Sequence, residues 1–325
     1  MRFGFALVER QRPRACCIRM GQRVRHRPWA WLGSLALGMI TACSQPSSTA
    51  PAAQSTRSIR DSSSTNPPQL VVLGDSTAET LSYALQATAP AGTKVIDAAL
   101  FGCGLAIGTN ASFDPPHPQM AMFPSCNSAS PSSEQWPALD VEAVRSTAPG
   151  DVIFFVAGVW ETEDLLIGGK WTNILAPSFQ RNEIRQMRRV VQIGTAHGAH
   201  FELATMPANA AGAVIRHSPV GQDSPTRRMI YDRLITRVAG EFPGRASVVD
   251  LAAILSPGGE YRATLNGVQV RTHDGVHTPS YAPGNPFSGN SSYPVAEAFY
   301  QWLGPKIWPL IVASSRAHRE ASSAG

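Results

Sequence analysis

The sequence contains no hydrophobic run long enough to cross a bilayer as a stable helix, and no internal repeat. It also lacks the G-x-x-x-x-G-K-[ST] phosphate loop, so nothing favours a kinase. Charged residues make up only 16% of the chain, and the net charge of +5 is unevenly distributed. Residues 1–43 hold eight arginines and one glutamate, which leaves 20 basic and 22 acidic residues in 44–325. This nearly neutral remainder has no basic surface of the kind that binds nucleic acid.

Residues 1–43 resemble an export signal. An arginine-rich segment precedes the apolar run 31–40, and small residues follow before Cys43. The ending Ile-Thr-Ala-Cys resembles the bacterial lipobox, whose cysteine is diacylated and becomes the mature N-terminus. We therefore expect Cys43 to anchor the exported protein to the cell membrane, outside the cytoplasm; a plain signal peptide is the alternative. Met20 would start a signal of ordinary length, and residues 1–19 are then a start-site artefact.

Cysteine is scarce, with five residues in the chain. Cys16 and Cys17 precede the expected cleavage site, and Cys43 is the expected lipid site. Cys103 and Cys126 remain as an even pair in an oxidising compartment. That context predicts a disulfide between them, with two buried free thiols as the alternative.

The rest of the chain divides into a tether, a domain and a tail. Residues 44–68 are rich in Ser, Thr, Pro and Ala, which predicts a flexible tether. From 69 to about 312, short apolar runs alternate with helical patterns, and we expect residues 313–325 to be loose. The predicted strands are 69–73, 94–99, 151–157, 200–206 and 246–250, and the predicted helices are about 77–88, 178–197, 226–241 and 292–312. The Pro-rich stretches 105–149 and 278–290 are typical of lids and binding loops.

The predicted strands are continuous apolar runs, as expected for parallel strands that are covered on both faces. Strands that alternate with helices predict an α/β fold. We expect a three-layer α/β/α sandwich with a five-stranded, mostly parallel sheet.

A serine stands where the first predicted strand gives way to a helix, in Gly74-Asp75-Ser76. Ser76 and Glu79 fit the S-x-x-E capping box, in which side chains satisfy the free N–H groups of a helix start. Alternatively, the Ser76 hydroxyl is a nucleophile at the edge of the sheet where open α/β folds bind their ligands. The stretch alone leaves both interpretations open.

A second polar motif, Asp274-Gly-Val-His277, precedes the last predicted helix. This spacing lets the carboxylate contact one ring nitrogen of the histidine while the other faces outward, as a serine nucleophile requires. The alternative is a loop histidine beside a turn-forming Asp-Gly pair. A metal site through His273 and His277 lacks a third ligand, so we expect no metal.

Taken together, Gly-Asp-Ser after the first strand and Asp-x-x-His before the last helix resemble the SGNH (GDSL) hydrolase superfamily over residues 69–312. The G-x-S-x-G elbow of α/β-hydrolases is absent. The resemblance implies a flavodoxin-like SGNH hydrolase fold. It also implies that Ser76 is the nucleophile, His277 the general base and Asp274 the residue that orients it.

The resemblance further implies an oxyanion hole formed by the N–H of Ser76 and that of a glycine after the second strand. Gly102 is the candidate, with Gly104 as the alternative. Where the family places Gly-x-Asn, this chain has Gly158-Val-Trp-Glu, so Trp160 occupies the position of the Asn donor. Its indole N–H could donate one hydrogen bond, or Trp160 is a core aromatic. In this respect the chain resembles the SGNH domains of bacterial surface-glycan acyltransferases, which can carry a Gly-x-Trp-Glu pattern at the same place.

Four further polar residues follow strands. Glu161, Glu163 and Asp164 could form a glycosidase carboxylate pair, or an acidic surface loop. Asn209 follows the fourth strand and is a candidate pocket residue.

We therefore expect a serine-dependent O-acyl esterase or acyltransferase, without a cofactor, that acts on an acylated glycan or small ester of the cell envelope. A transferase would need a membrane partner that exports acyl groups. The alternatives are a non-catalytic glycan-binding lipoprotein on the same fold and a broad-specificity lipase.

Overall fold

A five-stranded parallel sheet forms the centre of the protein. The computed structural model describes residues 69–105, 110–112, 119–121, 141–210, 223–282 and 289–323. In sheet order the strands are β2 (Lys94–Asp97), β1 (Gln69–Gly74), β5 (Val152–Val156), β8 (His200–Ala204) and β9 (Ala246–Val249). All four pairings are parallel, and the order of the strands is that of flavodoxin-like doubly wound sheets. The predicted α/β fold class and all five predicted strands are confirmed.

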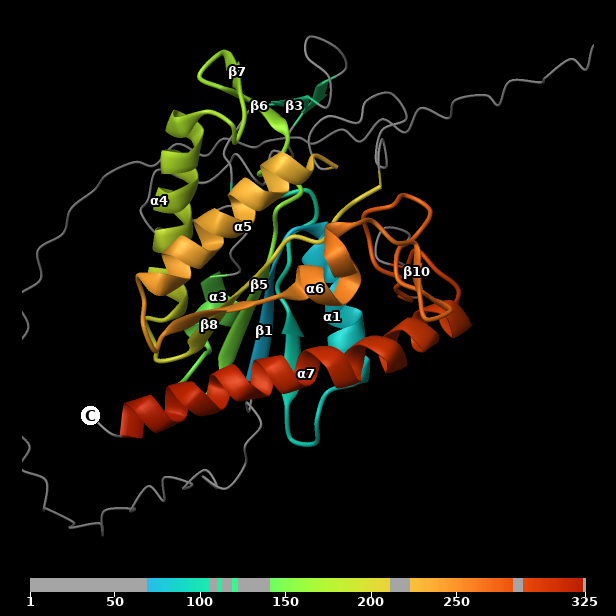
Figure 1. The fold of residues 1–325 in the computed structure, drawn as a ribbon. Helices are drawn as coiled ribbons and strands as arrows, with labels where there is room; N and C mark the ends of the chain where they lie inside the picture. The colour runs from blue at the N-terminus through green and yellow to red at the C-terminus, as the bar shows by residue number, and fades with distance from the viewer. Residues whose placement is uncertain are drawn as a thin grey trace, which may run out of the picture. The chain divides into compact units, whose positions relative to one another are not determined.

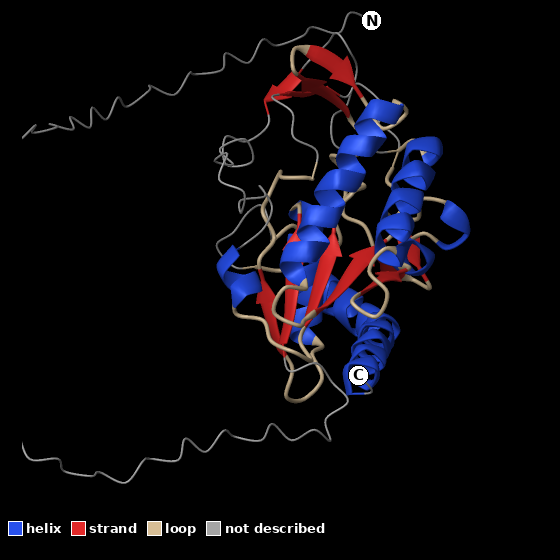
Figure 2. Cartoon of the chain, turned by 90° about the vertical axis from the view of Figure 1, so that its left-hand side faces the viewer, coloured by secondary structure: helices blue, strands red, loops and turns tan. Residues whose placement is uncertain are grey.

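Helices cover both faces of this sheet (Figures 1 and 2). The helices are α1 (Ser76–Ala87), α4 (Pro177–Gly194), α5 (Pro225–Gly240) and α7 (Tyr293–Ser323). Successive residues of β1 point to opposite faces. Val71 and Leu73 pack into the core beneath α4 and α5, while Leu70 and Val72 pack into the core beneath α1 and α7. The three predicted layers are therefore present.

The last helix is longer than the sequence predicts. It continues to Ser323, so residues 313–323 of the expected loose tail are helical. Two prolines, Pro305 and Pro309, lie inside it. No helix among the described residues is long and apolar enough to cross a membrane. The predicted signal segment 1–43 and tether 44–68 lie outside the described residues.

Several short elements were not expected. A second sheet is antiparallel and has the strand order β4-β3-β6-β7, and β10 and β11 form a hairpin. Their bounds are β3 (Asn110–Ser112), β4 (Gln119–Ala121), β6 (Asp164–Ile167), β7 (Lys170–Thr172), β10 (Thr264–Leu265) and β11 (Val268–Gln269). Two short helices, α3 (Val141–Arg145) and α6 (Leu251–Leu255), and a 3-10 turn at Pro257–Gly259 complete the described elements. These strands have two to four residues each, which is too short to give a clear periodic sequence signal.

Candidate active site

Helix α1 begins at Ser76, but the residue before it is the cap. The Asp75 side chain accepts a hydrogen bond from the backbone N–H of Thr77 at 2.8 Å. The predicted capping box is therefore wrong, because Asp75 occupies the N-cap position and Ser76 is the first helical residue. The Ser76 hydroxyl instead lies 2.8 Å from Nε2 of His277.

A tight strand-to-helix turn presents Ser76 at the carboxyl edge of the sheet. The backbone of Gly74 has φ +139°, and a β-carbon placed there would lie 1.7 Å from the carbonyl oxygen of Val156. Only glycine lets β1 approach β5 this closely. The backbone N–H of Asp75 donates to the same Val156 oxygen at 3.3 Å, which fixes the turn against the neighbouring strand.

The loop before α7 supplies the other two polar groups. Nδ1 of His277 lies 2.6 Å from Oδ2 of Asp274, while its Nε2 faces Ser76. The second carboxylate oxygen of Asp274 accepts from the Thr272 hydroxyl and from the backbone N–H groups of Val276 and His277, at 2.7, 2.9 and 3.0 Å. The structure thus joins Ser76, His277 and Asp274 in one hydrogen-bonded line, across 201 residues of sequence.

The carboxylate of Asp274 is held in its ionised form. Burial alone would raise its pKa, but the hydrogen bond from His277, the charge of that ring and the remaining donors hold the pKa of Asp274 below its usual range. An ionised carboxylate at Nδ1 keeps the proton on that nitrogen and leaves Nε2 free to accept one from Ser76.

Two of the residues predicted to hold an oxyanion, Ser76 and Gly102, lie in turns that a backbone hydrogen bond connects. Ser76 is the first residue of α1, and the first N–H groups of a helix have no acceptor within it. Gly102 is buried at φ +73° in the turn that follows β2. The Leu100 N–H donates to the carbonyl of Gly74 at 2.9 Å, which ties this turn to the end of β1.

Glu161 joins the two loops beside this site and was not predicted to do so. Its carboxylate accepts from the backbone N–H of Leu105, in the loop after β2, and from that of Gly158, after β5, at 2.7 Å for the latter. A β-carbon on Gly104 would lie 2.4 Å from Glu161 Oε1, so glycine is required there too. We infer that Glu161 positions the loop that carries Gly102.

The acidic stretch around Glu161 is not a surface loop. Glu161 and Glu163 are fully buried, and Asp164 is nearly so. Asp164 lies 3.4 Å from the buried guanidinium of Arg227. The surface-loop interpretation is wrong, because these carboxyl groups face the interior.

The other predicted site residues have mixed outcomes. Trp160 is buried in the core beneath α4 and α5, and its β-carbon lies against Gly104. This burial is what the core-aromatic alternative predicts. Cys103 is disulfide-bonded; Cys126 and Cys43 lie outside the described residues.

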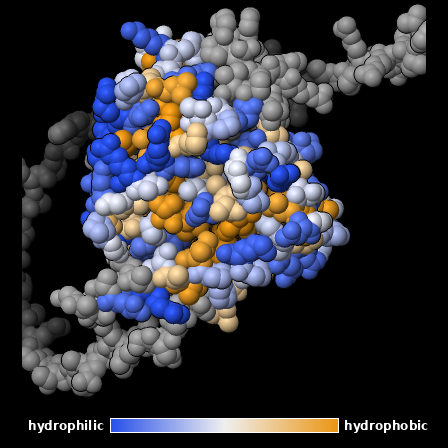
Figure 3. All heavy atoms as spheres, in the orientation of Figure 1, coloured by the Kyte–Doolittle hydropathy of each residue, from blue (hydrophilic) through white to orange (hydrophobic). Residues whose placement is uncertain are grey.

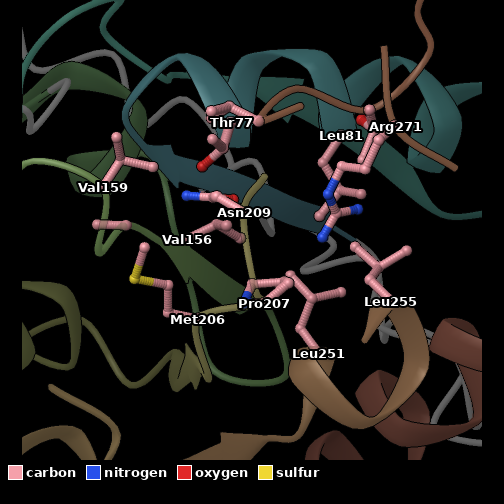
Figure 4. A pocket seen from close by; sticks show the side chains of 13 residues that line it. Thr77, Leu81, Val156, Val159, Met206, Pro207, Asn209, Leu251, Leu255 and Arg271 are labelled. Atoms are coloured by element: carbon pink, nitrogen blue, oxygen red, sulfur yellow. The ribbon is translucent and has the colours of Figure 1, made fainter. Parts of the chain in front are cut away.

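A narrow pocket, whose lining is drawn in Figure 4, adjoins the two segments that carry Ser76 and His277. Thr77 and Val276, the sequence neighbours of that pair, form part of its wall, and so does Asn209. Its apolar wall includes Leu81, Val156, Met206, Pro207, Leu251 and Leu255. Hydrophobic residues also gather across the middle of the face on which α6 lies (Figure 3).

Among the described residues, no group of three or more His, Cys, Asp or Glu side chains could hold a metal ion. His273, considered above as a ligand, is exposed.

Burial gives Glu161 a measurable effect on stability. Burial first, and the nearby charge of Asp75 second, raise the pKa of Glu161 from 4.5 to about 7. As the pH rises from 4.5 to 7, the unfolded chain loses this proton before the folded protein does. The folded state therefore loses up to about 3 kcal/mol of stability from this group across that interval.

Glu161→Gln removes this titration, and its amide can no longer accept both N–H groups. We expect the variant to be less stable than the wild type at pH 5, with a smaller difference at pH 8. Urea unfolding between pH 4.5 and 8 measures the difference, with the exposed Glu297→Gln as the matched control. If the difference in free energy of unfolding between the wild type and Glu161→Gln stays constant with pH, burial does not raise the pKa of Glu161 as stated.

Comparison with known proteins adds little to this geometry. No family model matches the chain, and no curated protein matches it. The alignment with one solved crystal structure covers 74% of this chain and 97% of the chain in that structure, at 14% sequence identity and a TM-score of 0.39. A likeness this distant supports no inference, so the argument for function depends on the site alone.

Proposed function

We propose that this protein is a serine-dependent O-acyl esterase or acyltransferase of the SGNH type, acting on acylated carbohydrate of the cell envelope. One observation carries the proposal. The hydroxyl of Ser76 lies 2.8 Å from Nε2 of His277, and Asp274 holds the other ring nitrogen at 2.6 Å. A base that lies within hydrogen-bond reach of a serine hydroxyl, and that a partly buried acid orients, activates the serine for attack on a carbonyl carbon.

The reaction follows from these contacts. Oγ of Ser76 attacks the ester carbonyl while its proton passes to Nε2 of His277, and Asp274 stabilises the resulting imidazolium. In this proposal the backbone N–H groups of Ser76 and Gly102 stabilise the tetrahedral oxyanion. When the tetrahedral intermediate collapses, the bond to the alcohol breaks and the departing alcohol takes the proton from His277. The acyl group remains on Ser76. Water then releases the acid, or a sugar hydroxyl accepts the acyl group.

The cellular setting belongs to the same proposal. An exported protein held by a lipid on Cys43 would meet cell-envelope glycans outside the cytoplasm. As a transferase, it would receive acyl groups from a membrane protein that exports them. The pattern at Trp160 and Glu161 supports the carbohydrate substrate only through the resemblance described above.

Incubation with O-acetylated methyl glycosides tests the function. We expect acetate release in buffer, and acetyl transfer when a second sugar is added if the enzyme is a transferase. A series of esters with longer acyl chains distinguishes the lipase alternative, which would prefer long chains. Binding of these glycosides without release or transfer of the acyl group would support the non-catalytic lipoprotein instead.

A further inference from the structure

A buried guanidinium lines the pocket beside the proposed nucleophile. Arg271 is only 2% exposed, and its side chain points toward the middle of the pocket, facing Pro207 and Leu255 (Figure 4). It belongs to the same loop as Asp274 and His277, three residues before the acid.

This guanidinium has few partners within the protein. Its NH1 group donates to the carbonyl of the adjacent Val270 at 3.1 Å, and its Nε has no hydrogen-bond partner. No carboxylate of the described residues lies within the 4.0 Å ion-pair distance of Arg271. Tyr261 and Asp274 raise the pKa of Arg271 only by longer-range electrostatic interaction, which is weaker than the opposite effect of burial.

A cation in this position is costly unless something compensates for it. Taking a charge out of water without a partner ion is unfavourable by several kcal/mol, so buried charges are normally paired. Burial lowers the pKa of Arg271 to about 10, which still leaves it protonated at neutral pH. A ligand that enters the pocket is therefore the natural source of the missing negative charge.

We propose that this pocket is a subsite for a carboxylate group of the ester substrate, held by Arg271. A planar carboxylate matches the fork of guanidinium donors, and the apolar wall accepts the carbon atoms that lead to it. The carboxylate belongs to the acyl chain, as in a succinyl ester, or to the sugar, as in an acetylated uronic acid. Arg271 forms no covalent bond, and the acyl transfer proceeds as proposed above, on which this inference rests.

Two pairs of substrates test the subsite and distinguish the two sources. The first pair is methyl glucoside carrying a 6-O-succinyl or a 6-O-butyryl group. The second is mono-O-acetylated methyl glucuronate and the matching acetylated methyl glucoside. In at least one pair we expect kcat/KM to be tenfold or more higher for the carboxylate substrate. Arg271→Met should reduce the ratio of kcat/KM between the carboxylate substrate and its neutral partner at least tenfold. Arg271→Lys should retain part of this preference.

Arg228→Met is the matched control, because Arg228 is also buried but donates to Gly259 outside the pocket. It should leave the ratio unchanged. Thermal unfolding without ligand checks that the variants fold; Arg271→Met should match or exceed the wild type, since an unpaired buried charge is removed. A ratio near one in both pairs for the wild type, or a ratio that survives Arg271→Met, would overturn the subsite.

The same experiment separates this inference from the proposed function. Cleavage of the neutral esters that depends on Ser76, without a carboxylate preference, overturns the subsite alone. If no ester is cleaved, the change in melting temperature on adding free succinate or methyl glucuronate tests the subsite instead. A rise in melting temperature in the wild type that Arg271→Met abolishes supports the subsite, and no rise overturns it.

Discussion

Replacing Ser76 with alanine is expected to reduce the rate of ester cleavage by about 10⁴-fold or more, because it removes the atom that forms the acyl-enzyme. The oxyanion donors and the pocket remain, so we expect some residual rate above that in buffer. Since Ser76 is not the cap of α1, its loss should leave the helix start intact. The free energy of unfolding should therefore change little.

Ser82→Ala is the matched control for this prediction. Ser82 is a buried serine of the same helix whose hydroxyl donates to the carbonyl of Glu79, away from His277. We expect it to keep the wild-type rate. Initial rates with an aryl acetate and with an acetylated glycoside measure both variants. Equal rates for Ser76→Ala and the wild type would leave a binding protein as the better description.

Replacing Asp274 with asparagine is expected to lower kcat by about 10³- to 10⁴-fold. One oxygen of Asp274 accepts three hydrogen bonds, from Thr272, Val276 and His277. An asparagine must keep its oxygen there, so its NH₂ group would face Nδ1 of His277. The ring would then carry its proton on Nε2, where it cannot accept one from Ser76.

The ionisation state of Asp274 in the wild type is part of this explanation. Burial opposes ionisation of Asp274, but the donors around it hold its pKa below the usual range, so the wild-type carboxylate stays ionised across the working pH. Asp151→Asn is the control, since Asp151 precedes β5 at the opposite edge of the sheet. A folded Asp274→Asn variant with wild-type kcat would show that the contact at Nδ1 is not needed.

The sequence predicts the fold well because the three inner strands of the central sheet, β1, β5 and β8, are buried on both faces. Their continuous apolar runs, such as Val152–Val156, leave little ambiguity. In helix α4, Ile184, Met187 and Val191 recur at helical spacing, and all three are buried. The end of α7 is not predicted: the expected helix 292–312 already contains Pro305 and Pro309, but the polar segment 313–323 that continues it has no apolar periodicity to indicate a helix.

The site is predicted less completely than the fold. Short motifs with turn glycines identify Ser76, Asp274 and His277, which the structure brings together. Sequence alone did not establish that Asp75 caps α1, since aspartate and serine are both good N-caps and stand side by side. The contacts of Glu161 with two loops and the burial of Arg271 have no sequence signal, because burial of a charged side chain depends on loops that meet only in the folded chain.

The central claim is that the hydroxyl of Ser76 becomes acylated through His277. Intact-protein and peptide mass spectrometry after brief reaction with an activated acetyl ester tests it directly. We predict a single added acetyl group on the peptide that contains Ser76, absent from the Ser76→Ala and His277→Ala variants. Ester cleavage by the wild type without any label on that peptide, or with the label on another residue, would contradict the account.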